Sequence, residues 1–233
     1  MHKTDIPSGA HFHERLASRW HQGYASGGFR RRLDFIESRL APLVGPGSRW
    51  LDAGCGAGTL TQTLARLGAQ GEAVDGSPAM IAAARQMGGD CSSGPFQFRV
   101  VHTVESLPYP DESFDGVLCS SVLEYLERPG AALSEFARVL RPGGRLLLTA
   151  ARTGSAVRTV QVVVRRVAAL AGRNAFEYLT VSRHTCGPGG LRRAVEAAAM
   201  RVDAIEPFDP VMPPWLQSVL PSSLLAVTAT RPA

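Results

Sequence analysis

The sequence predicts an α/β protein built on a doubly wound, largely parallel β-sheet, and three observations lead to this fold class. First, a short apolar run at 49–53 leads into Gly54, Gly56 and Gly58, and leucines at helical spacing follow. This is the order of strand, tight turn and helix that opens such a sheet. Second, the next strand-like run ends in Asp75. Third, apolar runs and helical patterns alternate as far as residue 150.

The composition is that of a soluble globular protein. The 233 residues are enough for one domain with a substantial core, and 45% of them are hydrophobic and 19% charged. The four cysteines are scattered without a C-x-x-C pair, so we expect neither a disulfide framework nor a metal cluster, and a cytoplasmic location. The first residues lack the apolar segment of a signal peptide, and no run is as long as a transmembrane helix.

The chain is basic, with a formal charge of +5 that comes almost entirely from arginine. A nucleic-acid-binding protein would gather its arginines together with exposed aromatic residues. Here the arginines are spread along the chain. We therefore expect a small-molecule substrate and no nucleic acid partner.

Two helices are expected before the first strand. Apolar and aromatic residues recur at every fourth position from Phe12 to Tyr24, and a second amphipathic pattern runs from about 29 to 40. A glycine pair separates the two patterns, and prolines and glycines end the second. We expect an N-terminal helical cap at 1–44, able to cover the mouth of a ligand site, and a main domain at 45–233.

The remaining elements follow from the same patterns of apolar periodicity and turn residues. The helices expected after the glycine-rich loop are 79–86, 129–140, 157–172 and 190–199. The strands expected after Asp75 are 96–101, 116–119, 145–150, 201–207 and 224–230.

Three details distinguish the glycine loop from a dinucleotide site. Its spacing is G-x-G-x-G, not the G-x-G-x-x-G that seats a pyrophosphate on a helix N-terminus. Asp52 precedes the loop, where an acid suits a cation better than a phosphate. Asp75 is followed by Ser77 and Pro78, which start a helix. With this pattern the chain resembles the class I S-adenosylmethionine-dependent methyltransferases, which implies a Rossmann-like sheet with an antiparallel last strand.

The resemblance also implies a donor site. In that family the glycine loop admits the amino-acid end of S-adenosylmethionine, an acid after the second strand binds the ribose, and residues after the third strand frame the adenine. The fourth strand ends beside the methyl group. The residues at these places in this chain are Asp52, Gly54, Gly56, Gly58, Asp75, Gly76, Thr103, Val104 and Ser120.

Several segments resemble the ubiquinone-biosynthesis O-methyltransferases in particular. The segment 32–36 resembles their R-L-x-x-I, whose arginine contacts the carboxylate of the donor, so Arg32 is expected there. The segment 103–105 resembles their T-V-E, and 119–125 stands where they have C-M-E-x-L-E-H. The segment 152–155 resembles part of their N-R-N-G-K-S.

The chain departs from that family at the residues associated there with a divalent metal. Their E-x-x-E-H acids and imidazole are replaced by Ser121, Glu124 and Tyr125, so one carboxylate remains of three ligands. A lone carboxylate is not a metal site. We therefore expect S-adenosylmethionine as donor, S-adenosylhomocysteine as product, and no metal.

The expected reaction is methyl transfer to an oxygen of a small aromatic or lipophilic acceptor. A phenol with a pKa near 10 would benefit from a base, for which His184 is the first candidate, followed by His102 and Glu124. N-methylation of a natural product and a non-catalytic cofactor-binding protein stay open as alternatives. A nicotinamide-dependent oxidoreductase would share the fold, but the glycine spacing and Asp52 speak against it.

The pattern at 157–172 predicts a basic amphipathic helix within a lid insertion at about 152–190. Its valines share one arc, and Arg158, Arg165, Arg166 and Arg173 lie opposite. Such a helix can lie on an anionic membrane surface, with the protein peripheral to it. We favour a lid packed on the sheet edge, because the arc lacks an aromatic anchor.

Overall fold

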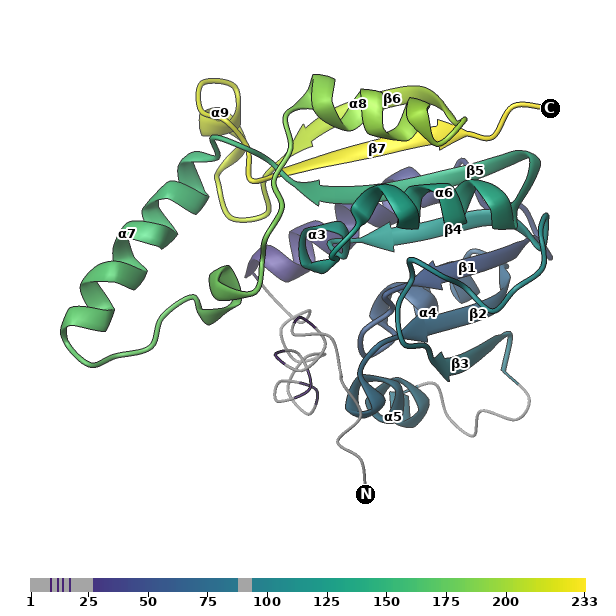
Figure 1. Cartoon of the computed structure of the whole chain (residues 1–233), viewed down its shortest axis with the longest axis horizontal. Helices are drawn as coiled ribbons and strands as arrows, with labels where there is room; N and C mark the ends of the chain where they lie inside the picture. Colours follow the sequence, from purple (N-terminus) through teal and green to yellow (C-terminus); the bar gives the residue numbers. More distant parts are fainter. Residues whose placement is uncertain (1–8, 10–11, 13, 15–16, 18–26, 88–93) are drawn as a thin grey trace.

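The sheet places all seven strands in the order β3-β2-β1-β4-β5-β7-β6 (Figure 1). The computed structural model describes residues 9, 12, 14, 17, 27–87 and 94–233. Neighbouring strands are parallel except for β7, which runs antiparallel to both β5 and β6. The predicted Rossmann-like sheet, mostly parallel with an antiparallel last strand, is confirmed.

The strands are β1 (Arg49–Ala53), β2 (Gln70–Asp75), β3 (Phe96–Val100), β4 (Phe114–Ser120), β5 (Leu140–Ala151), β6 (Arg201–Phe208) and β7 (Leu224–Thr230). The helices are α3 (Gly27–Leu40), α4 (Thr59–Arg66), α5 (Pro78–Met87), α6 (Pro129–Val139), α7 (Ala156–Leu170), α8 (Pro188–Ala197) and α9 (Pro214–Gln217). Two short 3-10 helices are η2 (Leu123–Tyr125) and η3 (Glu177–Thr180).

Consecutive residues of the central strands pack on opposite faces of the sheet, as the two-residue repeat of a strand requires. Trp50 and Leu147 join the cluster beneath α3, α4 and α5. Leu51 and Leu148 join the cluster beneath α6 and α8. Both faces are therefore covered by helices, and the carboxyl ends of the strands are left for a ligand.

Most element boundaries agree with the sequence prediction within two residues, and the exceptions have local causes. β5 begins at Leu140 instead of 145, because Leu140 already pairs with Phe114 before the Arg141–Gly144 turn interrupts the ladder. The expected helix from Phe12 to Tyr24 lies mostly outside the described residues. No helix among the described residues is long and apolar enough to cross a membrane.

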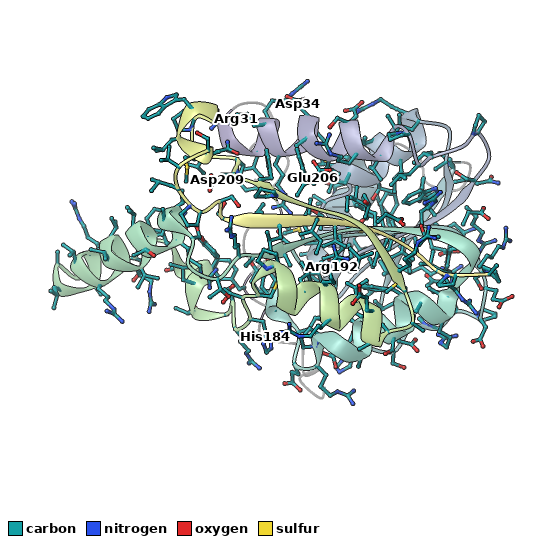
Figure 2. All side chains as sticks on the ribbon, turned by 90° about the horizontal axis from the view of Figure 1, so that it is seen from above. Arg31, Asp34, His184, Arg192, Glu206 and Asp209 are labelled. Atoms are coloured by element: carbon teal, nitrogen blue, oxygen red, sulfur yellow. The ribbon has the colours of Figure 1, made fainter. Side chains whose placement is uncertain are left out.

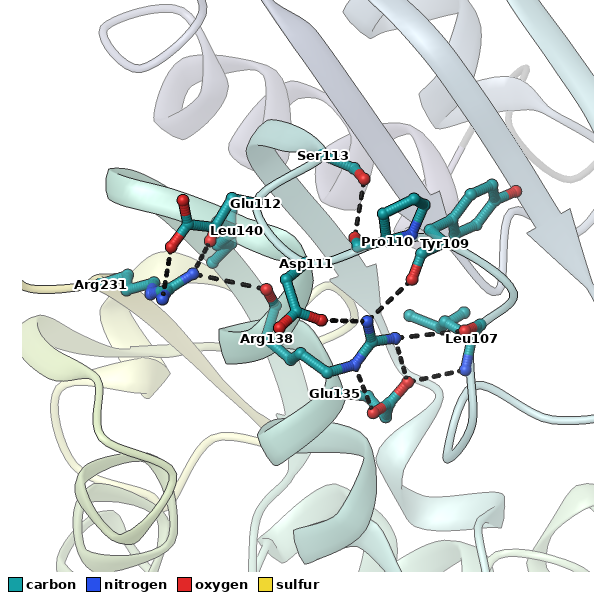
Figure 3. A network of polar contacts seen from close by, with 10 residues as sticks. All are labelled: Leu107, Tyr109, Pro110, Asp111, Glu112, Ser113, Glu135, Arg138, Leu140 and Arg231. Carbon is teal, nitrogen blue, oxygen red and sulfur yellow. Dashed lines mark hydrogen bonds and ion pairs between the residues drawn. The ribbon is translucent and has the colours of Figure 1, made fainter.

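Arg138 of α6 holds the loop between β3 and β4 in place (Figure 3). Its guanidinium donates to the carbonyl oxygens of Leu107 (3.2 Å) and Tyr109 (2.8 Å), to Asp111 (2.8 Å) and to Glu135 (2.7 Å). Glu135 also accepts from the Leu107 amide at 2.8 Å, and the hydrogen bond from Arg138 lowers the pKa of its carboxyl. The loop between β3 and β4 also carries Thr103 and Val104, so this network helps to fix the segment to which they belong.

We expect Arg138→Met to lower the free energy of unfolding by about 2–3 kcal/mol, because charge-assisted hydrogen bonds are lost and two loop carbonyls lose their partner. Urea denaturation measures the change. Arg192→Met is the matched control, since Arg192 makes an i,i+4 pair with Glu196 in which both side chains are 47% exposed. The control should change stability by less than about 0.5 kcal/mol. Equal losses in the two variants would contradict a supporting role for the Arg138 network.

Candidate active site

A cavity of about 1050 Å³ opens at the carboxyl ends of β1, β2, β4 and β5. Its wall contains Asp52 from β1, Asp75 at the end of β2 and Ser120 at the end of β4. Doubly wound sheets bind their ligands at this edge. The structure therefore brings together residues that the sequence placed on separate strands.

The three glycines of the loop after β1 all have positive φ, but their surroundings differ. Gly54 has φ +83°, and a Cβ there would lie 2.2 Å from the Cγ2 atom of Val122. Gly54 and Gly56 line the cavity, where a ligand approaches the backbone. Gly58 is not among the described residues of the lining; its Cβ would meet Ala84 and Phe98 at 3.1–3.2 Å. Gly58 thus permits close packing of α4.

Asp75 joins the glycine loop to the end of β2. Its carboxylate accepts hydrogen bonds from the amides of Gly56 (2.9 Å) and Ser77 (2.8 Å). Asp75 and Gly76 both line the cavity. One carboxylate therefore fixes the loop and presents negative charge to the same space.

Asp52 is 1% exposed, lines the same space and accepts a 2.6 Å hydrogen bond from the hydroxyl of Thr61. Burial raises the pKa of Asp52 from 3.8 to about 7, although the bond from Thr61 acts in the opposite direction. The neighbouring charge of Asp75 adds to the rise. This carboxyl is therefore ready to hold a proton, or to meet a cation.

A raised carboxyl pKa in the folded state means that the native protein holds this proton more tightly than the unfolded chain. The contribution of Asp52 to stability is present below pH 4 and is lost as the pH rises towards 7. As the pH rises over this range, we expect the free energy of unfolding of Asp52→Asn to increase relative to that of the unliganded wild type, by on the order of a few kcal/mol. Urea denaturation at a series of pH values measures the difference, with the exposed Asp34→Asn as control. A difference that is constant with pH would contradict the assignment.

Arg32 of α3 enters the cavity from the other side. Its Nη2 atom donates to the hydroxyl of Ser120 at 2.7 Å, and this hydroxyl lies 3.2 Å from that of Thr149. The Nε atom of Arg32 is buried and has no hydrogen-bond partner among the described residues. An unsatisfied buried donor is the kind of group that an anionic ligand would satisfy.

Thr103 and Val104 line the cavity after β3, where the sequence placed them. The Thr103 hydroxyl accepts from the amide of Glu105 at 3.1 Å, which shapes the turn. Val104 is buried. Both residues belong to the loop between β3 and β4, to which Arg138 donates hydrogen bonds.

Glu124 is a deeply buried acid in the lining of the cavity. It is 5% exposed, and its Oε2 atom has no hydrogen-bond partner among the described residues. Burial raises the pKa of the Glu124 carboxyl, and the positive charges of Arg32 and Arg158 offset part of this rise. The backbone is held as well, because the carbonyl of Glu124 accepts from the amides of Arg183 (2.7 Å) and His184 (3.3 Å).

Of the three candidate bases from the sequence, Glu124 and His102 belong to the lining of the cavity and His184 does not belong to its described part. His184 follows η3, its residue is exposed, and it is not among the described residues that line the cavity (Figure 2). Its amide bonds to the carbonyl of Glu124 and the chain then turns outward to α8. His102 does line the cavity, as an exposed residue at its rim. The geometry therefore favours Glu124 over His184 as a base.

The prediction that α7 packs its valines on the sheet edge is wrong. None of the described residues of α7 is buried, and Val160 and Val167 are each 62% exposed. The helix projects from the sheet, and only its first turns border the cavity, through Val157, Arg158 and Gln161 (Figure 1). Contact of its exposed arc with a membrane surface stays open as the alternative that the sequence analysis did not favour.

Sequence reasoning missed several residues that line the cavity or bond to its lining. Tyr178 of η3 donates a 2.5 Å hydrogen bond to Gln161, and Arg158 donates to the hydroxyl of Ser182 at 3.1 Å. Phe29 and Val211 also belong to the lining. None of these residues stands in a motif, and they meet only because segments distant in the sequence fold together.

Comparison with known proteins agrees with this geometry. Residues 51–148 match the family model of the methyltransferase domain. The chain is 34% identical over 194 residues to the ubiquinone biosynthesis O-methyltransferase of Xanthomonas oryzae pv. oryzae, covering 76% of this chain and 78% of that protein. It is 37% identical over 149 residues to the protein of the same name from Xanthomonas axonopodis pv. citri, where it covers 60% of the relative.

Solved structures share the fold at low sequence identity. A methyltransferase in complex with the Trm112 methyltransferase activator of Haloferax volcanii superimposes with a TM-score of 0.69 at 20% identity, over 95% of this chain and 98% of that one. An S-adenosylmethionine-dependent methyltransferase from Mesorhizobium loti gives 0.63 at 22% identity, over 85% and 98%. The sheet and the glycine loop agree with the sequence comparisons. The chain therefore belongs to the family of S-adenosylmethionine-dependent methyltransferases.

Proposed function

We propose that this enzyme transfers a methyl group to a hydroxyl oxygen of a small aromatic or lipophilic acceptor, with Glu124 as the general base. The observation that carries the proposal is the carboxyl of Glu124, a residue that lines the cavity and whose buried Oε2 atom has no hydrogen-bond partner among the described residues. A hydroxyl group of an acceptor would supply the missing donor. The names of the Xanthomonas relatives support oxygen as the methylated atom.

We propose that the donor lies along the glycine loop. Asp75 and Gly76 would bind the ribose, Thr103 and Val104 would frame the adenine, and Asp52 would face the ammonium group together with Gly54 and Gly56. Arg32 would bind the carboxylate, which suits its buried and unsatisfied Nε atom. Gly58 acts indirectly by allowing α4 to pack. The residues present therefore fit S-adenosylmethionine, whose sulfonium supplies an already activated methyl group.

The chain's own residues then have to align the acceptor and take its proton. In this mechanism the acceptor oxygen bonds to the methyl carbon as its proton passes to the carboxylate of Glu124, and S-adenosylhomocysteine leaves. A base whose pKa is raised by burial is better matched to a phenol than an exposed carboxylate is. Holding the oxygen in line with the methyl carbon supplies much of the remaining acceleration.

We assign Glu124 and the apolar residues of the lining to an acceptor side of the cavity, and these apolar residues favour an aromatic or lipophilic acceptor. Apolar side chains line this side of the cavity, from Phe29, Val157, Phe176, Val211 and Leu224. Burying an acceptor's apolar surface against them contributes about 25 cal/mol per Å². Segment 152–190 would act as the lid of this side through the first turns of α7 and through η3.

We also propose that transfer needs no divalent metal, because Ser121 and Tyr125 are poor partners for Glu124 in a metal site. Among the described residues no three histidines, cysteines or acids gather into a metal-binding group. Exhaustive treatment with a chelator should leave turnover unchanged. Loss of turnover that magnesium restores would overturn this part of the proposal.

The proposed function is tested with isotopically labelled S-adenosylmethionine and two matched probes, para-octylphenol and para-octylaniline. We expect label in the methyl ether of the phenol, with little transfer to the aniline. Preferred transfer to the aniline would establish N-methylation instead. Binding of the donor without transfer to any acceptor in a broad panel would identify a non-catalytic cofactor-binding protein.

A further inference from the structure

The connection between β6 and β7, residues 209–223, forms one wall of the acceptor side of the cavity. Pro210 and Val211 at its start and Ser223 at its end all belong to the lining. Antiparallel neighbours need no more than a short turn to connect them. This longer connection is held in one shape by a buried carboxylate at its base.

Asp209 is fully buried at the point where β6 ends. Its Oδ1 atom accepts from the amides of Val211 (2.9 Å) and Met212 (2.8 Å). Its Oδ2 atom accepts from the amide of Ser223 at 2.8 Å. A single side chain therefore ties together the two ends of the connection, and two of the three amides belong to residues that line the cavity.

The side chain of Gln217, in α9, makes hydrogen bonds to the backbone of the same connection. Its amide nitrogen donates to the carbonyls of Asp209 (3.0 Å) and Met212 (2.8 Å), and its oxygen accepts from the amide of Asp209 at 3.2 Å. We call the side chains of Asp209 and Gln217 the clasp. Every polar atom of the clasp bonds to the backbone of the connection. The clasp gives the wall a defined shape while the connection's outer face stays exposed, as at Trp215.

Helix α3 holds the same wall from outside. The Nε atom of Arg31 donates to the carbonyl of Pro210 at 2.7 Å, and its Nη2 atom to that of Val211 at 3.3 Å. Further along, Phe35 stacks on Phe208 with ring centroids 4.1 Å apart. Figure 2 shows Arg31 and Asp209 on the same side of the molecule.

Arg31 and Arg32 are consecutive but face different parts of the site. Arg32 reaches Ser120 on the donor side, whereas Arg31 bonds to the wall on the acceptor side. The two halves of the site therefore depend on different side chains of α3. This separation makes the acceptor wall accessible to mutation without a direct change at the donor.

We propose that Asp209 and Arg31 are positioning residues for the acceptor: they hold the wall made by Pro210, Val211 and Ser223 in the shape that seats it. The inference rests on the proposed function, because it needs an acceptor in this cavity. Neither residue touches the reacting atoms. Their loss should weaken acceptor binding and leave donor binding unchanged.

The experiment compares Asp209→Asn and Arg31→Met with the control Arg30→Met in the full chain. Arg30 lies on the same helix and pairs only with Asp34 in the contacts described, through an ion pair that is 58% and 53% exposed. In Asp209→Asn, an NH2 group replaces one acceptor oxygen, so at least one of the bonded amides loses its partner. Arg31→Met removes the outer support but leaves the buried carboxylate intact.

We expect both variants to raise KM for para-octylphenol by about tenfold, as loss of one or two hydrogen bonds would, with a smaller change in kcat. The Kd of S-adenosylhomocysteine, measured by calorimetry, should stay within about twofold of wild type. Hydrogen exchange should become faster in 210–223 and stay unchanged in the central strands. Arg30→Met should match wild type in all three measurements.

Unchanged KM in both variants would overturn the inference, and so would a loss of donor affinity as large as the loss of acceptor affinity. If Asp209→Asn does not fold, Arg31→Met decides by the same criteria. A wild-type enzyme that methylates no phenol contradicts the proposed function before any variant is made. In that case the inference is tested by hydrogen exchange of the complex with S-adenosylhomocysteine, with and without para-octylphenol. If this wall seats the phenol, para-octylphenol must slow hydrogen exchange in 210–223, and unchanged exchange there would overturn the inference.

Discussion

Replacing Glu124 with glutamine is expected to lower kcat about a hundredfold to ten-thousandfold, which is the usual contribution of a positioned general base. The amide keeps the size of the side chain and can still accept a hydrogen bond, but it cannot take the acceptor's proton. The affinity for S-adenosylmethionine should change little, because Glu124 lies on the acceptor side. Single-turnover rates with labelled donor and para-octylphenol measure the effect on the chemical step.

The pH dependence gives a second signature of the same residue. Only the ionised carboxylate of Glu124 can act as a base, so kcat should rise with pH as this group loses its proton. Because burial raises the pKa of Glu124, the acidic limb should lie above the ordinary value of 4.5. Glu124→Gln should lack that limb.

His184→Ala is the informative comparison, because His184 was the first candidate from the sequence and lies exposed outside the described lining. We expect its kcat to be close to that of wild type. An inactive His184→Ala beside an active Glu124→Gln would show that the base is the histidine and that the segment rearranges during catalysis.

Replacing Asp75 with alanine is expected to weaken binding of S-adenosylmethionine by about 2–3 kcal/mol, or roughly thirtyfold to 150-fold. Two effects add in the same direction. The hydrogen bonds from a ribose to a charged acceptor are lost, and the amides of Gly56 and Ser77 lose the carboxylate that holds them at 2.9 and 2.8 Å. Calorimetric titration with S-adenosylmethionine and with S-adenosylhomocysteine measures the change.

Asp34→Ala is the matched control for this measurement, since Asp34 is an exposed acid that pairs with Arg30 on the outer side of α3. Its donor affinity should equal that of wild type. Unchanged donor affinity in Asp75→Ala would remove the ribose assignment and would leave the glycine loop without its proposed role.

The residues of the proposed donor half could be placed in one cavity from the sequence because their determinants are local. Strand β1, the glycine loop and α4 are consecutive, and the left-handed φ of Gly54 needs a glycine whatever surrounds it. Asp75 ends the next strand of a parallel pair, and parallel strands bring their carboxyl ends to one edge. Apolar runs also identified the strands, in which consecutive residues such as Leu146 and Leu147 pack on opposite faces of the sheet.

The prediction for α7 failed for a physical reason. An amphipathic pattern shows that one side of a helix is apolar, but it does not say what covers that side. The chain between β5 and α8 leads α7 away from the sheet, so Val163 and Val167 stay exposed (Figure 1). Only the first turns reach the cavity.

The sequence by itself determined the fold class, the glycine loop and the acids of the donor side, because each depends on residues close together in the chain. The tertiary structure alone decided the acceptor side. Arg31 bonds to Pro210 across 179 positions of sequence, and burial in the folded protein raises the pKa of Glu124. Burial and long-range hydrogen bonds exist only once the chain has folded, and they are the observations that support Glu124 over His184 as the proposed base and Asp209 as a proposed positioning residue.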